Sequence, residues 1–233
     1  MPTHPITVEG LSDAFASVGW VGGTPSFVPI APSLSDRSVG DALTGYDPAD
    51  DELQVVVVDQ VISAGFPLGT GVHLAISAAA GGAAGWLPLA CSLAVSDAIR
   101  ASAQLPVEVE WPNVLSIPGA MCGGSAGSQR VGSVDTSLNE SHATIAVTVC
   151  ALASISDLNP GTTSLLAAGG TVNRERLIAH ILIAMRDRLR QWRATHPELH
   201  ADYRARCRTV GQLVDGGWVS DIDDRGDVEV TAS

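Results

Sequence analysis

The sequence predicts an α+β domain in which a mixed, largely antiparallel β-sheet packs against helices. Runs of β-branched or alternating apolar residues, typical of strands, are interspersed with stretches whose apolar residues recur at helical spacing. The chain has 233 residues, 45% of them hydrophobic, which is enough for one well-buried core and a small appendage. We therefore expect one domain over residues 1–210 and a short C-terminal appendage over residues 211–233.

The N-terminal half is expected to contain a short helix, three strands and a longer helix. The short helix covers residues 11–18, the strands cover residues 26–30, 53–58 and 72–77, and the longer helix covers residues 86–101. The run 53–58 is apolar and largely β-branched, as in a strand that is buried on both faces. Pro88 falls in the first turn of the longer helix, a position that tolerates proline.

The C-terminal half is expected to contain two strands followed by two helices. The strands cover residues 107–111 and 144–152, and the helices cover residues 173–195 and 198–207. In the first helix, Leu177, Ile181 and Met185 begin one apolar stripe. Residues 116–129 are rich in Gly and Ser and are expected to form a loop. The tail from residue 211 is expected to hold at most two short strands.

The charge of the chain excludes several classes of function. The net charge is −12, and all 13 basic residues are Arg, because the sequence contains no Lys. An acidic chain repels phosphate backbones, so we expect no nucleic-acid binding. The absence of Lys excludes a lysine phosphate clamp or Schiff base, and the chain cannot itself carry biotin or lipoate on a Lys. Nine of the 13 Arg fall between residues 174 and 208, which we interpret as solvated helix faces.

The sequence predicts neither a membrane span nor a secretory signal. Residues 60–96 contain no Asp, Glu, Lys or Arg, but Gly81, Gly82, Gly85 and Pro88 interrupt this segment. The N-terminus lacks a basic region followed by an apolar one. The four Cys form no C-x-x-C pair, so we expect free thiols in a reducing compartment and a cytoplasmic location.

Two other chemistries are disfavoured by the spacing of the residues that would perform them. The six His are scattered, and no acidic ligand accompanies His196 and His200, so we expect no metal site. Residues 123–127 satisfy the pattern G-x-S-x-G, which in hydrolases lies between a strand and a helix. Here the residues after the pattern are expected to continue as a loop, which argues against a hydrolase.

Two stretches resemble the biotin protein ligases, part of the biotin and lipoate ligase superfamily. The first is Glu110-Trp111-Pro112-Asn113, which resembles that family's Lys-Trp-Pro-Asn-Asp signature. The second runs from residue 162 to residue 214 and contains Thr162-Thr163-Ser164-Leu165-Leu166, Gln191-Trp192-Arg193 and Asp202-Tyr203-Arg204. The resemblance covers residues 86–214 most clearly. It implies the catalytic-domain fold of the class II aminoacyl-tRNA-synthetase-like biotin and lipoate ligases.

The resemblance also implies an activity, cofactors and partners. In the family, ATP and Mg²⁺ activate biotin, and the biotinyl group is then passed to a Lys of a carrier protein. An anionic carboxylate must attack an anionic phosphate, so the site needs fixed positive charge. The family supplies this charge from a Gln-Thr-Ala-Gly-Arg-Gly-Arg loop and from a Lys after the Trp-Pro-Asn-Asp turn.

In this sequence both sources of positive charge are altered. Gln60 matches the Gln of the family loop, but no Arg follows it before Arg100. Met121 stands at the family's Lys position when residues are counted without gaps from Trp111. Val114 replaces the Asp of the signature, and Cys150 stands where a strand of the family ends in a functional Asn. The appendage over residues 211–233 is also short compared with the small barrel of the family.

The residues that would line a ligand pocket by this resemblance come from four segments. They are Ser33, Ser35, Gln60, Trp111, Asn113, Gly123 and Gly124. For Trp111 alone, core packing is a better interpretation than a stacking platform, and for Asn113 a turn is the better interpretation. No residue is assigned a catalytic role, because Met121 cannot replace the chemistry of a Lys.

Three functional hypotheses follow. In the leading one, the chain is a biotin protein ligase-like protein with lost or greatly reduced adenylation and transfer. It would bind a biotin-like small acid, or a partner that is a carrier protein or an active ligase. In the second, the chain is an active biotin or lipoate ligase in which Arg37 or Arg130 reaches the phosphates. In the third, it is a structural homodimer without a ligand, which Met121 and Phe66 filling the pocket would favour.

Overall fold

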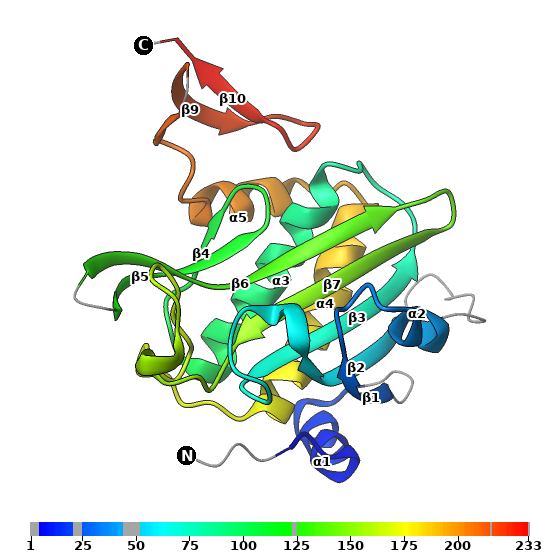
Figure 1. The fold of residues 1–233 in the computed structure, drawn as a ribbon. Coiled ribbons are helices and arrows are strands. Elements are labelled where there is room, and N and C mark those ends of the chain that lie inside the picture. Colours follow the sequence, from blue (N-terminus) through cyan, green and yellow to red (C-terminus); the bar gives the residue numbers. More distant parts are fainter. Residues whose placement is uncertain (1–4, 21–24, 44–51, 123–124, 215, 233) are drawn as a thin grey trace.

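A computed structural model of the chain describes residues 5–20, 25–43, 52–122, 125–214 and 216–232, and shows a seven-stranded sheet with helices against it (Figure 1). The strands are β1 (Ser26–Ala31), β2 (Gln54–Val61), β3 (Gly71–Ala79), β4 (Glu108–Glu110), β5 (Val114–Cys122), β6 (Ser125–Leu138) and β7 (His142–Cys150). Their order in the sheet is β1-β2-β3-β7-β6-β5-β4. Only β1 and β2 pair in parallel among these strands, so the predicted α+β class with a mixed, largely antiparallel sheet is confirmed.

One face of this sheet is covered by α3 (Trp86–Ala103) and α4 (Arg174–Arg193), which lie behind the sheet in Figure 1. The helix α3 is buried around most of its circumference. In α4, Asn173 caps the first turn by accepting a hydrogen bond from the backbone N–H of Arg176 at 2.7 Å. Leu177 and Ile181 of α4 pack with strand residues such as Val57 in one large apolar core. Burial of this face is the main source of stability for the domain.

A buried ion pair joins the start of α4 to the sheet. The guanidinium of Arg174 donates to the Asp59 carboxylate of β2 at 3.0 Å and to the Gly71 carbonyl oxygen at 3.2 Å. Asp59 also accepts a hydrogen bond from the backbone N–H of Ile6 at 3.2 Å. The two side chains are 2% and 7% exposed, so each offsets the cost of removing the other from water. The N-terminal segment before α1 (Val8–Val18) is thereby fixed to the sheet.

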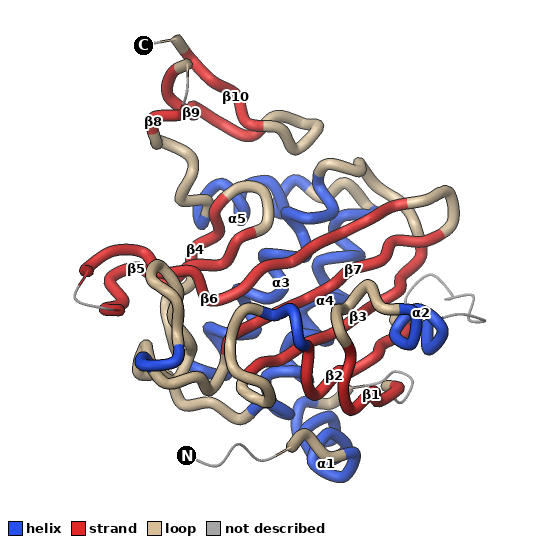
Figure 2. Tube along the Cα trace, viewed as in Figure 1, coloured by secondary structure: helices blue, strands red, loops and turns tan. Residues whose placement is uncertain are grey.

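The opposite face of the sheet is covered only in part. Near β1 and β2, α2 (Arg37–Leu43) packs over a small apolar cluster that includes Val39, Val56 and Ala75. Two 3₁₀ turns, η1 (Ile62–Ala64) and η2 (Ile155–Asp157), lie in the segments that follow β2 and β7 (Figure 2). Between these coverings the strands β6 and β7 are left open to a cavity.

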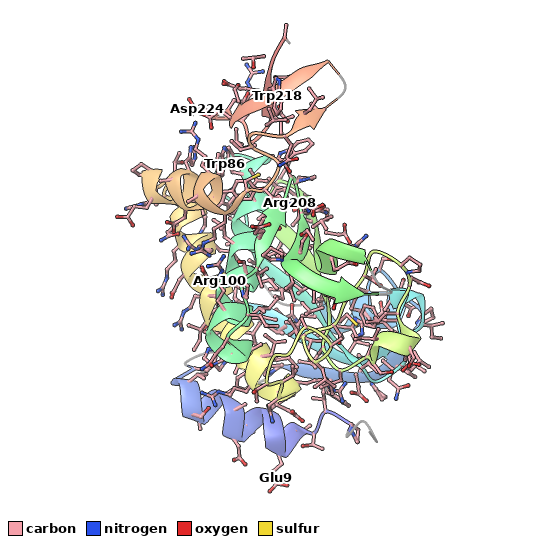
Figure 3. All side chains as sticks on the ribbon, turned by 90° about the vertical axis from the view of Figure 1, so that its left-hand side faces the viewer. Glu9, Trp86, Arg100, Arg208, Trp218 and Asp224 are labelled. Carbon is pink, nitrogen blue, oxygen red and sulfur yellow. The ribbon has the colours of Figure 1, made fainter. Side chains whose placement is uncertain are left out.

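The C-terminal appendage forms a second, three-stranded sheet and not the two short strands expected. Its strands are β8 (Leu213–Val214), β9 (Gly217–Ile222) and β10 (Val228–Thr231), in the order β10-β9-β8. This sheet projects from the end of the domain beyond α5 (Pro197–Arg206), and Figure 3 shows Trp86 below it and Trp218 within it. The indole N–H of Trp86 donates to the Asp223 carbonyl oxygen at 3.1 Å, and that of Trp111 donates to the Gly226 carbonyl oxygen at 2.8 Å.

The sequence predicted a loop over residues 116–129, which is wrong for residues 116–122, part of β5, and for residues 125–129, the start of β6. Gly and Ser have low intrinsic strand preference, and here β5 and β6 hold each other extended by pairing as an antiparallel hairpin. Ser125 therefore begins a strand, and no helix follows the G-x-S-x-G pattern. Within the described part of the chain, no helix combines the length and apolar character needed to cross a membrane.

Candidate functional site

A cavity of about 660 Å³ lies on the face of the sheet away from α3 and α4. Its size is within the range of small-molecule sites, roughly 300–1,000 Å³. The lining comes from the loop after β1, the loop after β2, strands β6 and β7, and the loop after η2. The lining residues used below are Ser33, Ser35, Phe66, Arg130, Ser133, Asp135, Thr148, Cys150, Asn159 and Thr163.

A β-bulge in β6 decides which of its side chains face the cavity. Leu115 of β5 pairs with Gly132, but the next residue, Ser116, pairs with Arg130, so β6 contains one extra residue at Val131. In a regular strand, residues five apart point to opposite faces of the sheet. The extra residue reverses the alternation, and Arg130 and Asp135 both line the cavity.

Gly132 permits the close approach of β6 and β7 at this bulge. A Cβ atom on Gly132 would lie 2.4 Å from the carbonyl oxygen of Thr148, a contact that only glycine avoids. From there the strands run in register, with Ser133 opposite Thr148 and Asp135 opposite Ala146. These four residues all line the cavity and form part of its floor.

The loop after η2 closes the cavity by extending the sheet. Arg130 donates its backbone N–H to the Gly161 carbonyl oxygen at 3.0 Å, and its own carbonyl oxygen accepts from Thr163 at 2.8 Å. The side-chain amide of Asn159 donates to the Gly65 carbonyl oxygen at 3.4 Å, which joins this loop to the loop after β2. Residues far apart in the sequence therefore meet around one ligand-sized space.

The charged groups of the cavity are few and opposite in sign. Arg130 is the one cation and Asp135 the one anion among the described lining residues. The guanidinium of Arg130 is exposed and has no side-chain partner within the described part of the chain. Asp135 accepts one hydrogen bond at Oδ1, from the Asn113 side-chain amide at 3.3 Å. The formal charges of the described lining therefore cancel, in contrast to a site built for several phosphates.

Cys150 lines the cavity but is poorly suited to nucleophilic chemistry. Its thiol is buried, and this burial raises the thiol pKa to about 12. The reactive form of Cys is the thiolate, which is scarce when the pKa lies far above neutral pH. Cys150 therefore contributes apolar surface to the cavity.

His73 lies beside the cavity, beneath Phe66. The two rings stack with centroids 5.6 Å apart, and Phe66 faces the cavity while His73 is 1% exposed. Burial, with a further effect from the nearby Arg174 charge, lowers the His73 pKa to about 4. His73 is therefore neutral near pH 7, and its ring packs as an uncharged group. Its Nδ1 atom is buried without a hydrogen-bond partner among the described residues.

The residues expected to bind a ligand fall into three groups. Ser33 and Ser35 line the cavity, with their hydroxyl oxygens 3.0 Å apart. Gln60 and Trp111 do not line it: Gln60 is half-buried on β2, and the Trp111 indole binds Gly226 of the appendage. Asn113 is not a lining residue, but its side-chain amide donates a hydrogen bond to Asp135, which lines the cavity.

Four further positions of interest fall where the side chains or the residues themselves are not described. Gly123 and Gly124 lie outside the described residues, and the side chains of Met121 and Arg37 are also not described. The prediction that Met121 occupies the family's Lys position stays a prediction. Of the two Arg proposed to reach a nucleotide, Arg130 is described and does line the cavity.

Sequence reasoning missed much of the cavity wall. Ser133, Asp135 and Thr148 were not singled out, and Phe66 was considered only as a residue that could fill the pocket. A signal for the β6 residues exists in the pattern Arg130-Val131-Gly132-Ser133, because a glycine inside a strand indicates a bulge or close approach. Recognising it required first assigning this segment to a strand.

Comparison with known proteins begins with sequence. No protein-family model matches the chain. The biotin--[acetyl-CoA-carboxylase] ligase of Mycobacterium tuberculosis is 32% identical over 156 residues, which is 61% of this chain and 55% of that protein. The chain thus spans about half the length of this curated relative.

Comparison with solved structures gives the same fold over nearly the whole chain. The biotin protein ligase of Aquifex aeolicus has a TM-score of 0.68 at 15% identity, covering 91% of this chain and 92% of that one. A biotin protein ligase-like protein of unknown function from Silicibacter sp. TM1040 has a TM-score of 0.68 at 18% identity, covering 89% and 90%. The Leishmania major biotin protein ligase in complex with biotinyl-5-AMP has a TM-score of 0.60 at 15% identity, covering 90% and 95%. These low identities establish a shared fold and nothing further.

Proposed function

We propose that the chain is a member of the biotin and lipoate ligase family, which the sequence relative and the shared fold support. On this premise, the chain binds a small biotin-like carboxylic acid. Its ability to adenylate this acid and to transfer it is lost or greatly reduced. The observation that carries this proposal is the charge of the cavity. One guanidinium, that of Arg130, is available to a ligand carboxylate. That is enough to hold one acid, because an Arg–carboxylate contact is satisfied by a single pair of groups.

The residues present do not fit a magnesium nucleotide. A triphosphate brings several negative charges, whereas the described lining offers one Arg and opposes it with one Asp. Magnesium prefers carboxylate oxygens together with phosphate oxygens. No group of three or more His, Cys, Asp or Glu positioned to hold a metal occurs in the described ranges. We therefore derive no adenylation step for this cavity.

Isothermal titration calorimetry tests the proposal, with biotin, lipoate and octanoate as the three acids. We expect at least one acid to bind, and Arg130→Gln to weaken that binding by about tenfold, equivalent to about 1.4 kcal/mol. Arg176→Gln, which alters an exposed Arg on α4, is the matched control and should leave binding unchanged. If none of the three acids binds, the proposal is wrong.

The second candidate, an active ligase with rearranged charge, is favoured by one observation. Arg130 lines the cavity and is exposed, so it is placed to meet a phosphate if a nucleotide enters. ATP–pyrophosphate exchange in the presence of biotin separates the two functions. We expect no exchange above background. Clear exchange that is abolished by Arg130→Gln would replace our leading proposal with this one.

We propose that the protein acts in the cytoplasm. There it binds either the free acid or a protein partner. A biotin carrier protein or an active ligase would be such a protein partner. The described cysteines Cys91, Cys150 and Cys207 are buried and unpaired, which is consistent with a reducing compartment. Pull-down of biotinylated carrier protein by the chain, compared with the unbiotinylated carrier, measures this interaction directly.

A further inference from the structure

We infer that the cavity selects acids that also carry an N–H or ammonium group at their far end, and that Asp135 recognises this second group. This inference rests on the proposed function, because it names the class of acid that the same cavity takes. Arg130 and Asp135 lie on one strand and face the same cavity only because of the bulge at Val131. A ligand that meets both residues therefore needs a negative group at one end and a donor at the other.

Asp135 has spare capacity to accept a hydrogen bond. A carboxylate has two oxygens and about four acceptor sites. Oδ1 accepts one hydrogen bond, at 3.3 Å from Asn113, whereas Oδ2 accepts none from the described residues. Asp135 is exposed, so solvent satisfies the remaining sites in the absence of a ligand. A ligand donor can therefore bind there without displacing a protein partner.

Asn113 positions the Asp135 carboxylate from the adjacent turn. The backbone carbonyl oxygen of Asn113 accepts from the N–H of Val134 at 3.1 Å, which fixes the turn against β6 next to Asp135. The side-chain amide of Asn113 then holds Oδ1. This arrangement orients the carboxylate before any ligand arrives, and such preorganisation lowers the cost of binding.

The spacing of the two charges sets the shape of the ligand. Five steps of ~3.3 Å along β6 place the two Cα atoms at most ~17 Å apart. Between them, Ser133 and Thr148 offer hydroxyl groups on the cavity floor. An extended acid with a polar donor at its far end matches this arrangement. A plain fatty acid would leave Asp135 facing an apolar chain end, and desolvating an unpaired carboxylate is costly.

A matched pair of probes tests this inference: octanoate and 8-aminooctanoate have the same chain and differ only in the terminal ammonium. We expect calorimetry to show 8-aminooctanoate binding about fivefold more tightly, a modest ratio because Asp135 is exposed. Asp135→Asn should reduce the preference to less than about twofold, because the neutral amide neither attracts the ammonium nor opposes the apolar chain end of octanoate as strongly as the carboxylate does. Asp187→Asn, an exposed Asp on α4, is the matched control and should keep the preference. Raising the salt concentration should also reduce the preference, because it screens exposed charges.

The outcomes separate this inference from the proposed function. If both acids bind equally, or octanoate binds more tightly, the role of Asp135 is wrong while acid binding stands. If Asp135→Asn keeps the full preference, another group recognises the ammonium and the inference is again wrong. If no acid of any kind binds, both proposals fail together. Thermal unfolding of each variant, expected to match wild type, verifies that the substitution leaves the fold intact.

Discussion

The helix-covered face of the seven-stranded sheet and its cavity face differ in how their arginines are paired. On the helical side, Arg188 of α4 donates to Asp97 of α3 at 2.8 Å and to Asp202 of α5 at 2.6 Å. Arg206 of α5 also pairs with Asp97, so three helices meet in one ionic network. On the cavity side, Arg130 has no side-chain partner among the described residues. The arginines of the first region are structural, and that of the second is available to a ligand.

This difference shows that the number of basic residues in a sequence does not measure the charge of its site. Nine of the 13 Arg lie between residues 174 and 208, and Arg174, Arg188 and Arg206 among them are held by carboxylates. A buried or half-buried charge needs such a partner, because desolvation otherwise outweighs what the charge contributes. The earlier interpretation of this cluster as solvated helix faces is therefore wrong for Arg174 and Arg188, which are buried.

The largest change in the free energy of unfolding is expected when the Asp59–Arg174 pair is broken. Arg174→Met leaves the Asp59 carboxylate buried without its partner and should lower the free energy of unfolding by about 3–5 kcal/mol. Urea unfolding at pH 7 measures the loss. The control is Arg176→Met, an exposed position two residues further along α4, which should change stability by no more than about 0.5 kcal/mol.

The double variant Asp59→Leu/Arg174→Met separates the pair's contribution from that of side-chain volume. Removing both charges should recover most of the stability, because hydrophobic replacements of a buried ion pair are often neutral. A double variant as unstable as Arg174→Met alone would mean that the guanidinium's bond to the Gly71 carbonyl oxygen is the important one.

An intermediate effect is expected from pH, through His73. Its pKa is about 4 in the folded protein and about 6.5 when unfolded, so below pH 6.5 the unfolded chain binds more protons. Stability is therefore full above pH 6.5 and should fall by about 3 kcal/mol as the pH decreases toward 4. Urea unfolding across this range should show a shallower loss for His73→Gln, which cannot take up a proton. An identical pH slope in the two proteins would contradict a buried neutral His73.

The smallest change in the free energy of unfolding is expected at Arg130 of the cavity face, and Arg188 of the helix-covered face serves for comparison. Arg130→Gln should change the free energy of unfolding by no more than about 0.5 kcal/mol, since its guanidinium is exposed and its backbone bonds are kept. Arg188→Gln should cost about 2 kcal/mol, because charged hydrogen bonds to Asp97 and Asp202 are lost. Both are measured by urea unfolding. Similar losses in the two variants would show that the faces do not differ as described.

The sequence predicted the fold well where one local signal dominates. The predicted strand 53–58 overlaps β2 from Gln54 onward, and the apolar stripe that begins at Leu177 lies on α4, because period and composition agree there. It failed within residues 116–129, whose Gly and Ser are poor strand formers and whose extended form depends on the pairing of β5 with β6. Of the residues named from the sequence for a ligand site, Ser33 and Ser35 line the cavity, whereas the Trp111 indole donates a hydrogen bond to the appendage.

By itself the sequence determined the elements with strong periodicity, the resemblance to the biotin protein ligases and the absence of any lysine. These follow from the order and chemistry of neighbouring residues, which no tertiary contact alters. Only the tertiary structure decided that Arg130 and Asp135 share one cavity, because this depends on a one-residue bulge and on how Gly132 meets Thr148. It likewise decided which arginines are paired, since the carboxylates that hold Arg174 and Arg188 come from other elements of the chain.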